Sequence, residues 1–181
     1  MKLGLLARPM LVLGVLVALP AGAQQLIHLG VAAGGAFPVG RLDSTFTAGR
    51  SGLVTVSIGP QDAAFGVRFD YQYDGFKGKT PAGGGATPSD IHVNSVTGNI
   101  VMPFRIGYAK PYIIGGAGIY PLKLPGMTKR ETDWGDNIGA GIGFPIPGTT
   151  VGGFVEARYH DVNRSNASPY HFVPVTLGIL F

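Results

Sequence analysis

Four side chains of the types used in nucleophilic catalysis lie close together near the end of the sequence: His160, Asp161, Ser165 and Ser168. A serine hydroxyl becomes a nucleophile when a histidine within hydrogen-bonding distance accepts its proton and a carboxylate orients that histidine. These residue types would suit hydrolysis or transfer of an acyl group. Proximity along the chain does not establish the required geometry, and we predict no catalytic residue.

A second set of polar residues consists of opposite charges two positions apart. Arg68 and Asp70 alternate with apolar residues, and so do Glu156 and Arg158. Successive side chains of a β-strand point to opposite faces, so each charged pair shares one face of its strand. On opposite walls of a narrow barrel, Arg68 would lie level with Glu156, and Asp70 level with Arg158. We predict a buried, structural ion-pair network, with glycines making room for it; a gated ion path is the alternative.

The sequence offers no motif for a metal ion or an organic cofactor. His28, His92 and His171 stand alone, without the spacing of metal ligands. The glycine clusters lack the Gly-Lys-Ser/Thr ending of a phosphate-binding loop. We therefore expect neither a metal nor a cofactor.

Residues 1–23 have the features of a secretory signal peptide. Lys2 and Arg8 give a positive start, an apolar run covers positions 10–19, and small residues follow. The run is too short for a transmembrane helix, which needs about 20 residues. Loss of Lys2 and Arg8 would lower the net charge from its full-chain value of +4, which leaves too little positive charge to favour nucleic acid. We expect one mature domain over residues 24–181.

That domain contains eight strand-like segments separated by Gly- and Pro-rich turns: 25–37, 52–59, 63–73, 91–102, 111–122, 136–144, 151–161 and 170–181. Charged residues make up only 13% of the chain, and the mean hydropathy is +0.27. Soluble domains typically contain about 25% charged residues. Plentiful but interleaved apolar residues are typical of strands with one face in lipid.

The connections between these segments alternate in length. Tight turns are predicted at 59–62 and 146–149, a somewhat longer connection on the same rim at 103–110, and long polar connections at 38–50, 74–90, 123–135 and 162–169. Outer-membrane barrels have short turns in the periplasm and long loops outside. Aromatic residues gather near the segment ends, as in interfacial girdles, and include Tyr71, Tyr73, Trp134, Tyr159 and Tyr170 at one rim and Phe104, Tyr108, Tyr112, Phe144 and Phe181 at the other.

Residues 110–120, 137–144, 154–160 and 172–178 resemble strands five to eight of the small eight-stranded outer-membrane β-barrels, the family that includes OmpA- and OmpX-type domains. The resemblance implies insertion into the outer membrane by the barrel-assembly machinery, which recognises a terminal strand of this kind. The alternating apolar residues Leu177, Ile179 and Phe181 would form that insertion signal. The family has no shared catalytic motif.

We therefore expect an all-β protein: an eight-stranded antiparallel up-and-down transmembrane β-barrel, monomeric, in the outer membrane of a Gram-negative-type cell envelope. A packed, charged lumen would exclude free diffusion and leave a structural or surface-interaction role. We expect contact with outer-membrane lipid and lipopolysaccharide, with plain solvation of the loops as the alternative; the loop cations are Lys77, Lys79, Lys123, Lys129, Arg130 and Arg164. Two other functions stay open: a soluble, exported, lipocalin-like ligand-binding barrel, and a lipid-modifying outer-membrane enzyme that uses His160.

Overall fold

The computed structural model describes residues 27–59, 64–104, 106–123, 131–164 and 168–181. The predicted signal peptide lies outside the described residues. Within these ranges, no helix has the length and apolar character needed to cross a membrane.

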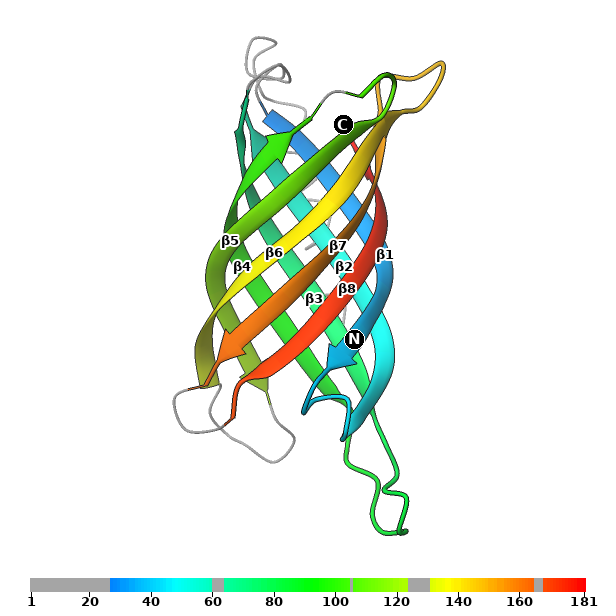
Figure 1. Ribbon diagram of the computed structural model, residues 1–181, viewed down its shortest axis with the longest axis vertical. Helices are drawn as coiled ribbons and strands as arrows, with labels where there is room; N and C mark the ends of the chain where they lie inside the picture. Colours follow the sequence, from blue (N-terminus) through cyan, green and yellow to red (C-terminus); the bar gives the residue numbers. More distant parts are fainter. Residues whose placement is uncertain (1–26, 60–63, 105, 124–130, 165–167) are drawn as a thin grey trace, which may run out of the picture.

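Eight β-strands form one closed barrel in the order of the sequence (Figure 1). They are β1 (Ile27–Val39), β2 (Phe46–Ile58), β3 (Gly66–Gly78), β4 (Ile91–Pro103), β5 (Lys110–Lys123), β6 (Glu131–Pro145), β7 (Gly152–Asn163) and β8 (Tyr170–Leu180). Each strand pairs antiparallel with the next, and β8 pairs antiparallel with β1. The predicted eight-stranded antiparallel up-and-down barrel is confirmed.

The last strand closes the barrel. The pairing of β8 with β1 begins at Gly30↔Leu180. Just beyond it, the backbones of Leu29 and Phe181 exchange two hydrogen bonds of 2.8 and 2.7 Å. An open sheet edge exposes a row of unpaired backbone groups that invites aggregation, and closure removes that edge.

Three strands extend at least five residues further toward the long-loop end than the sequence pattern predicted. β2 begins at Phe46 instead of position 52, β3 continues to Gly78 instead of 73, and β6 begins at Glu131 instead of 136. The pairing of β2 with β3 continues to Phe46↔Gly78 after one register shift. The predicted connection 38–50 was wrong, because backbone pairing continues through polar residues after the apolar alternation has ended.

The barrel wall has an apolar outer face and a polar inner face along β3 and β7. Phe69 is 51% exposed, whereas its neighbours Arg68 and Asp70 are 5% and 2% exposed. Val155 is 42% exposed, whereas Glu156 is 2% exposed. Soluble proteins bury apolar side chains and expose charged ones, the opposite distribution. Exposed apolar side chains on the remaining strands include Val31, Phe37, Val54, Val96, Ile100, Ile113, Ile138, Ile142 and Leu177.

An apolar cluster fills the lumen toward the long-loop end. Its buried members are Ala36, Leu42, Phe76, Ile91, Val93, Tyr120, Val162, Tyr170 and Phe172. The rings of Phe76 and Phe172 meet edge to face, with centroids 5.6 Å apart. Because these side chains come from strands all around the barrel, they obstruct the lumen at this level.

Two aromatic residues that the sequence placed on the outer girdles point into the lumen instead. Tyr170 is 7% exposed and belongs to the apolar cluster. Tyr112 contacts Glu156 inside the barrel. Each lies two positions from a buried residue, Phe172 and Ile114 respectively, and strand alternation puts both on the inner face.

Candidate functional site

Four charged residues meet in the middle of the lumen and form a closed ring of ion pairs, which we call the charge ring: Arg68, Asp70, Glu156 and Arg158. Arg68 Nη2 lies 2.7 Å from the Glu156 carboxylate, and Arg158 Nη1 lies 2.8 Å from Asp70 Oδ2. Arg68 Nε also lies 3.2 Å from the Asp70 carboxylate, and Arg158 Nε lies 2.7 Å from Glu156 Oε1. Each arginine therefore contacts both carboxylates.

The strands β3 and β7 position these charges from opposite sides of the barrel. Each supplies two inward positions, and the Arg68–Glu156 contact joins residues 88 apart in sequence. The lumen of an eight-stranded barrel is just wide enough for side chains to fill it. An arginine rooted in one wall can therefore reach a carboxylate rooted in the other.

The charge ring is balanced and well protected from water. All four side chains are 6% exposed or less, and the ring contains two positive and two negative groups. An isolated buried charge costs several kcal/mol, and close pairing with hydrogen bonds offsets that cost. The arrangement suits a rigid link between β3 and β7 across the lumen.

Uncharged side chains complete the charge ring, and sequence reasoning did not assign them to it. Tyr112 donates its hydroxyl hydrogen to Glu156 Oε2 at 2.7 Å, and Asn99 Nδ2 donates to Asp70 Oδ2 at 2.9 Å. Asn137 Nδ2 donates to Asn99 Oδ1 at 2.9 Å. The alternation of polar residues on β4 could have placed Asn99 inside, but its partner depends on the register Arg68↔Asn99.

Glycines on β6 make the space that the charge ring occupies. A Cβ at Gly139 would lie 2.5 Å from Arg158 Cγ. A Cβ at Gly141 would collide with the ring of Tyr112. Any larger side chain at these positions would displace the residues that hold Glu156.

A second polar layer lies between the charge ring and the apolar cluster. Gln72 Nε2 donates to Asp74 Oδ2 at 3.0 Å, and both side chains are buried. The hydroxyl of Tyr120 and Nδ1 of His160 are 2.9 Å apart. His160 also stacks on Phe172, with ring centroids 4.8 Å apart.

The candidate catalytic residues are not brought together. His160 points into the lumen, whereas Asp161 points outward and lies 3.2 Å from His171 Nδ1. The Ser168 hydroxyl accepts a hydrogen bond from Arg41 Nη1 at 3.1 Å. Ser165 lies outside the described residues. Adjacent positions on a strand face opposite sides, so His160 and Asp161 cannot act as a base and its orienting carboxylate.

The three isolated histidines have separate surroundings. His28 lines the lumen at the short-turn end. His92 Nδ1 lies 2.8 Å from the Tyr73 hydroxyl, and His171 contacts Asp161. Over the described part of the chain, no three His, Cys, Asp or Glu side chains are grouped so that they could hold a metal ion.

The predicted insertion-signal residues lie together on the outer face of β8 and its end. Leu177 is 60% exposed, Ile179 40% and Phe181 51%. Their alternation leaves Thr176 and Gly178 facing inward, where Thr176 is 4% exposed. The three side chains thus form a continuous apolar stripe on the barrel wall.

Comparison with known proteins finds similarity at the level of structure. No protein-family model and no curated protein matches the sequence. The crystal structure of Neisserial surface protein A, NspA, aligns with a TM-score of 0.61 and 16% identity, over 85% of this chain and 95% of that one. The N-terminal β-barrel domain of Pseudomonas aeruginosa OprF aligns with a TM-score of 0.50 and 11% identity, over 85% of this chain and 97% of that domain. The chain therefore has the fold of the small eight-stranded outer-membrane β-barrels.

Proposed function

We propose that this chain is a small outer-membrane β-barrel protein with a structural or surface-interaction role, and that it does not let solutes diffuse freely. One observation carries the proposal: the barrel buries a charge ring in its lumen and exposes apolar side chains on its outer wall. A soluble lipocalin-like barrel would need the reverse distribution.

The outer wall fits a hydrocarbon environment. Phe69, Ile100, Ile138 and Leu177 are each more than half exposed, and they come from four different strands. Soluble monomers rarely expose apolar patches larger than a few hundred Å². A wall that is apolar around the barrel is matched by lipid on all sides, which favours a monomer in the membrane.

The lumen fits a closed barrel. The charge ring crosses it near the middle, and the apolar cluster around Phe76 and Phe172 fills it nearer the long loops. Barrels that leave an open aqueous channel have about 16 strands. Two obstructions in series favour exclusion of solutes over a gated ion path.

The proposed partners are outer-membrane lipid, lipopolysaccharide and, during biogenesis, the barrel-assembly machinery. Lys77 and Lys79 are exposed at the long-loop end, where they could meet anionic head groups. The stripe of Leu177, Ile179 and Phe181 is the segment that the assembly machinery would recognise. We propose no nucleic-acid partner and no cofactor.

The test combines extraction with conductance. We expect the protein to need detergent for release from the cell envelope and to change gel mobility on heating, as a folded barrel does. Refolded protein in a planar bilayer should show no stable open channel. Release in a periplasmic wash would favour the soluble alternative, and steady conductance would contradict the closed lumen.

A lipid-modifying enzyme is the weaker alternative, because His160 and Asp161 face opposite sides of the wall. The His160→Ala variant separates it from the main proposal. Unchanged lipid A in cells that carry this variant, compared with wild type and a deletion strain, is the expected result.

A further inference from the structure

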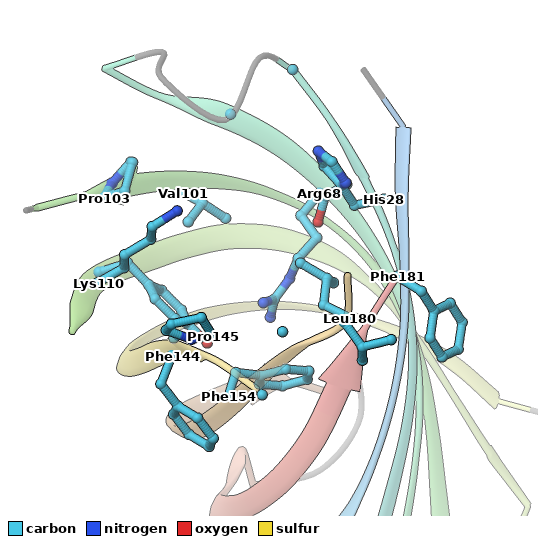
Figure 2. A pocket seen from close by; sticks show the side chains of 18 of the residues that line it. His28, Arg68, Val101, Pro103, Lys110, Phe144, Pro145, Phe154, Leu180 and Phe181 are labelled. Carbon is cyan, nitrogen blue, oxygen red and sulfur yellow. The ribbon is translucent and has the colours of Figure 1, made fainter. Parts of the chain in front are cut away.

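A cavity of about 370 Å³ opens at the short-turn end of the barrel, which we call the short-turn cavity. Its lining comes from all eight strands, and Arg68 of the charge ring lies at its inner end. Figure 2 shows Arg68, Phe154 and Leu180 directed toward one another across it, with Phe181 pointing away. The volume lies within the range of ligand sites, which is about 300–1,000 Å³.

The short-turn cavity exists because one inward glycine of β6 is left uncovered. Gly139 and Gly141 are covered by Arg158 and Tyr112. At Gly143, a Cβ would have only ordinary contacts, the nearest being the Lys110 backbone oxygen at 3.6 Å. The space there is consequently open, although the same strand packs tightly two residues away.

Among the described residues, the charged groups that line the short-turn cavity are cationic. They are Lys110 and Arg68, and the His28 imidazole lies beside them; no Asp or Glu is among the described lining residues. Arg68 is balanced by the charge ring, but Lys110 has no ion-pair partner among the described residues. His28 Nε2 is buried and has no hydrogen-bond partner within the described part of the chain. Two nitrogens, Lys110 Nζ and His28 Nε2, therefore lie beside the cavity without a hydrogen-bond partner among the described residues.

The short-turn cavity also has an apolar lining. Val101, Phe154 and Leu180 line it, and Phe154 is 5% exposed. A ligand that satisfied both kinds of lining would need a short hydrocarbon body and one anionic head. Charge-assisted hydrogen bonds to a carboxylate or phosphate are about twice as strong as neutral ones.

We propose that the short-turn cavity binds a small amphiphilic anion, whose alkyl chain lies against Phe154 and Leu180 and whose carboxylate or phosphate head meets Lys110 and His28. The cavity is at the opposite end from the long loops, so this activity is separate from any surface interaction. Its ligand would arrive from the side of the short turns.

The first experiment compares three probes of equal chain length. The full chain, uniformly labelled with nitrogen-15, is refolded into nanodiscs of zwitterionic lipid and titrated with octanoate, octyl phosphate and octanol. We expect saturable shifts of the Lys110, Gly143 and Phe154 amides with at least one of the two anions, and the anion that binds more tightly identifies the head group. Equal shifts with octanol, or no saturable shift with either anion, would overturn the proposal.

The second experiment uses variants of the short-turn cavity. Lys110→Gln should weaken binding of the preferred anion roughly tenfold, the loss of one good charged contact. Gly143→Leu should abolish binding by filling the space without changing the charge. Lys77→Gln removes an exposed cation at the other end and should leave the affinity unchanged.

Lys110 is exposed, so Lys110→Gln is expected to fold even if Gly143→Leu does not. An affinity that is unchanged in Lys110→Gln, or equally reduced in Lys77→Gln, would show that the anions bind elsewhere. Nanodiscs rather than micelles are needed, because detergent would compete for the cavity.

Discussion

At the scale of single residues, the charge ring is the feature with the largest energetic consequences. Each arginine contacts both carboxylates, and Tyr112 and Asn99 supply further hydrogen bonds. Loss of one charge leaves its former partners buried and unbalanced, which lowers the free energy of unfolding by about 3–5 kcal/mol. Loss of one charge of each sign leaves a neutral pair.

The first prediction concerns this balance. We expect Arg68→Met to lower the free energy of unfolding by about 3–5 kcal/mol. The double variant Arg68→Met with Glu156→Gln should lose less than the single variant, because Arg158 and Asp70 remain paired. Urea unfolding in lipid vesicles, followed by the single tryptophan, Trp134, measures both. Full stability in both variants would mean that the ring does not brace the barrel.

The second prediction concerns Tyr112, whose hydroxyl hydrogen bonds to Glu156. We expect Tyr112→Phe to cost about 1.5–3 kcal/mol, the contribution of a hydrogen bond to a charged group. Tyr108→Phe is the matched control, because Tyr108 is 91% exposed in a short turn. The same unfolding measurement should find the control unchanged, and equal losses in both variants would contradict the assignment.

The sequence was sufficient to place Arg68 and Glu156 on inner faces, because strand alternation requires only the order of residues. It was not sufficient for Tyr112 or Asn99. Their partners depend on the stagger of neighbouring strands, such as the register Arg68↔Asn99, which no single segment encodes. Tyr112 was instead attributed to an outer girdle because it lies near a strand end.

At the scale of the strand, β6 shows how a run of glycines is matched to its neighbours. Its inner face carries Gly139 beneath Arg158 and Gly143 beside the short-turn cavity. Both glycines face the lumen, but the space next to Gly139 is filled by Arg158, whereas the space next to Gly143 is open.

The third prediction uses that difference. A Cβ at Gly139 would collide with the backbone of Ala157 and lie 2.8 Å from Arg158 Cα, so Gly139→Ala should cost about 1–3 kcal/mol through overpacking. Gly143→Ala should change stability by less than about 0.5 kcal/mol. The temperature at which each variant loses the gel band of the folded barrel compares the stability of Gly139→Ala with that of Gly143→Ala. A larger loss in Gly143→Ala would mean that the short-turn cavity is tightly filled.

Strand existence was predictable and strand ends were not. All eight segments were identified from apolar alternation and turn residues, but β2 and β6 begin earlier than that pattern does. In the range 46–51 the chain pairs through polar residues such as Thr47 and Arg50. Hydrogen bonding between backbones extends a strand without leaving an apolar signature.

At the scale of the whole molecule, the two ends of the barrel differ. The connection between β3 and β4 is a long, exposed loop, and the one between β4 and β5 is a short turn that contains Tyr108. In Figure 1 the long green hairpin projects from one end and the C-terminus lies at the other. An outer-membrane protein should present the long loops to the medium.

The fourth prediction tests this orientation. The sequence contains no cysteine, so a single introduced thiol can be labelled without background. Ala86→Cys, in the long loop, should react with a membrane-impermeant maleimide on intact cells. Tyr108→Cys should react only after the outer membrane is permeabilised. The opposite pattern would reverse the proposed orientation, and labelling of both on intact cells would argue against a membrane-embedded barrel.

The charge ring also constrains the route by which the chain reaches its final form. Its two halves come from β3 and β7, and Arg68 and Glu156 lie 88 positions apart in the sequence. Until the sheet curls far enough to bring those strands face to face, each half holds one cation and one anion that lack their contacts across the barrel. Burial of these four charges is thus coupled to completion of the barrel, and a partly assembled sheet would have to keep that charged surface in water. Closure of the barrel and removal of water from the charge ring should therefore occur together, as a single late step of folding.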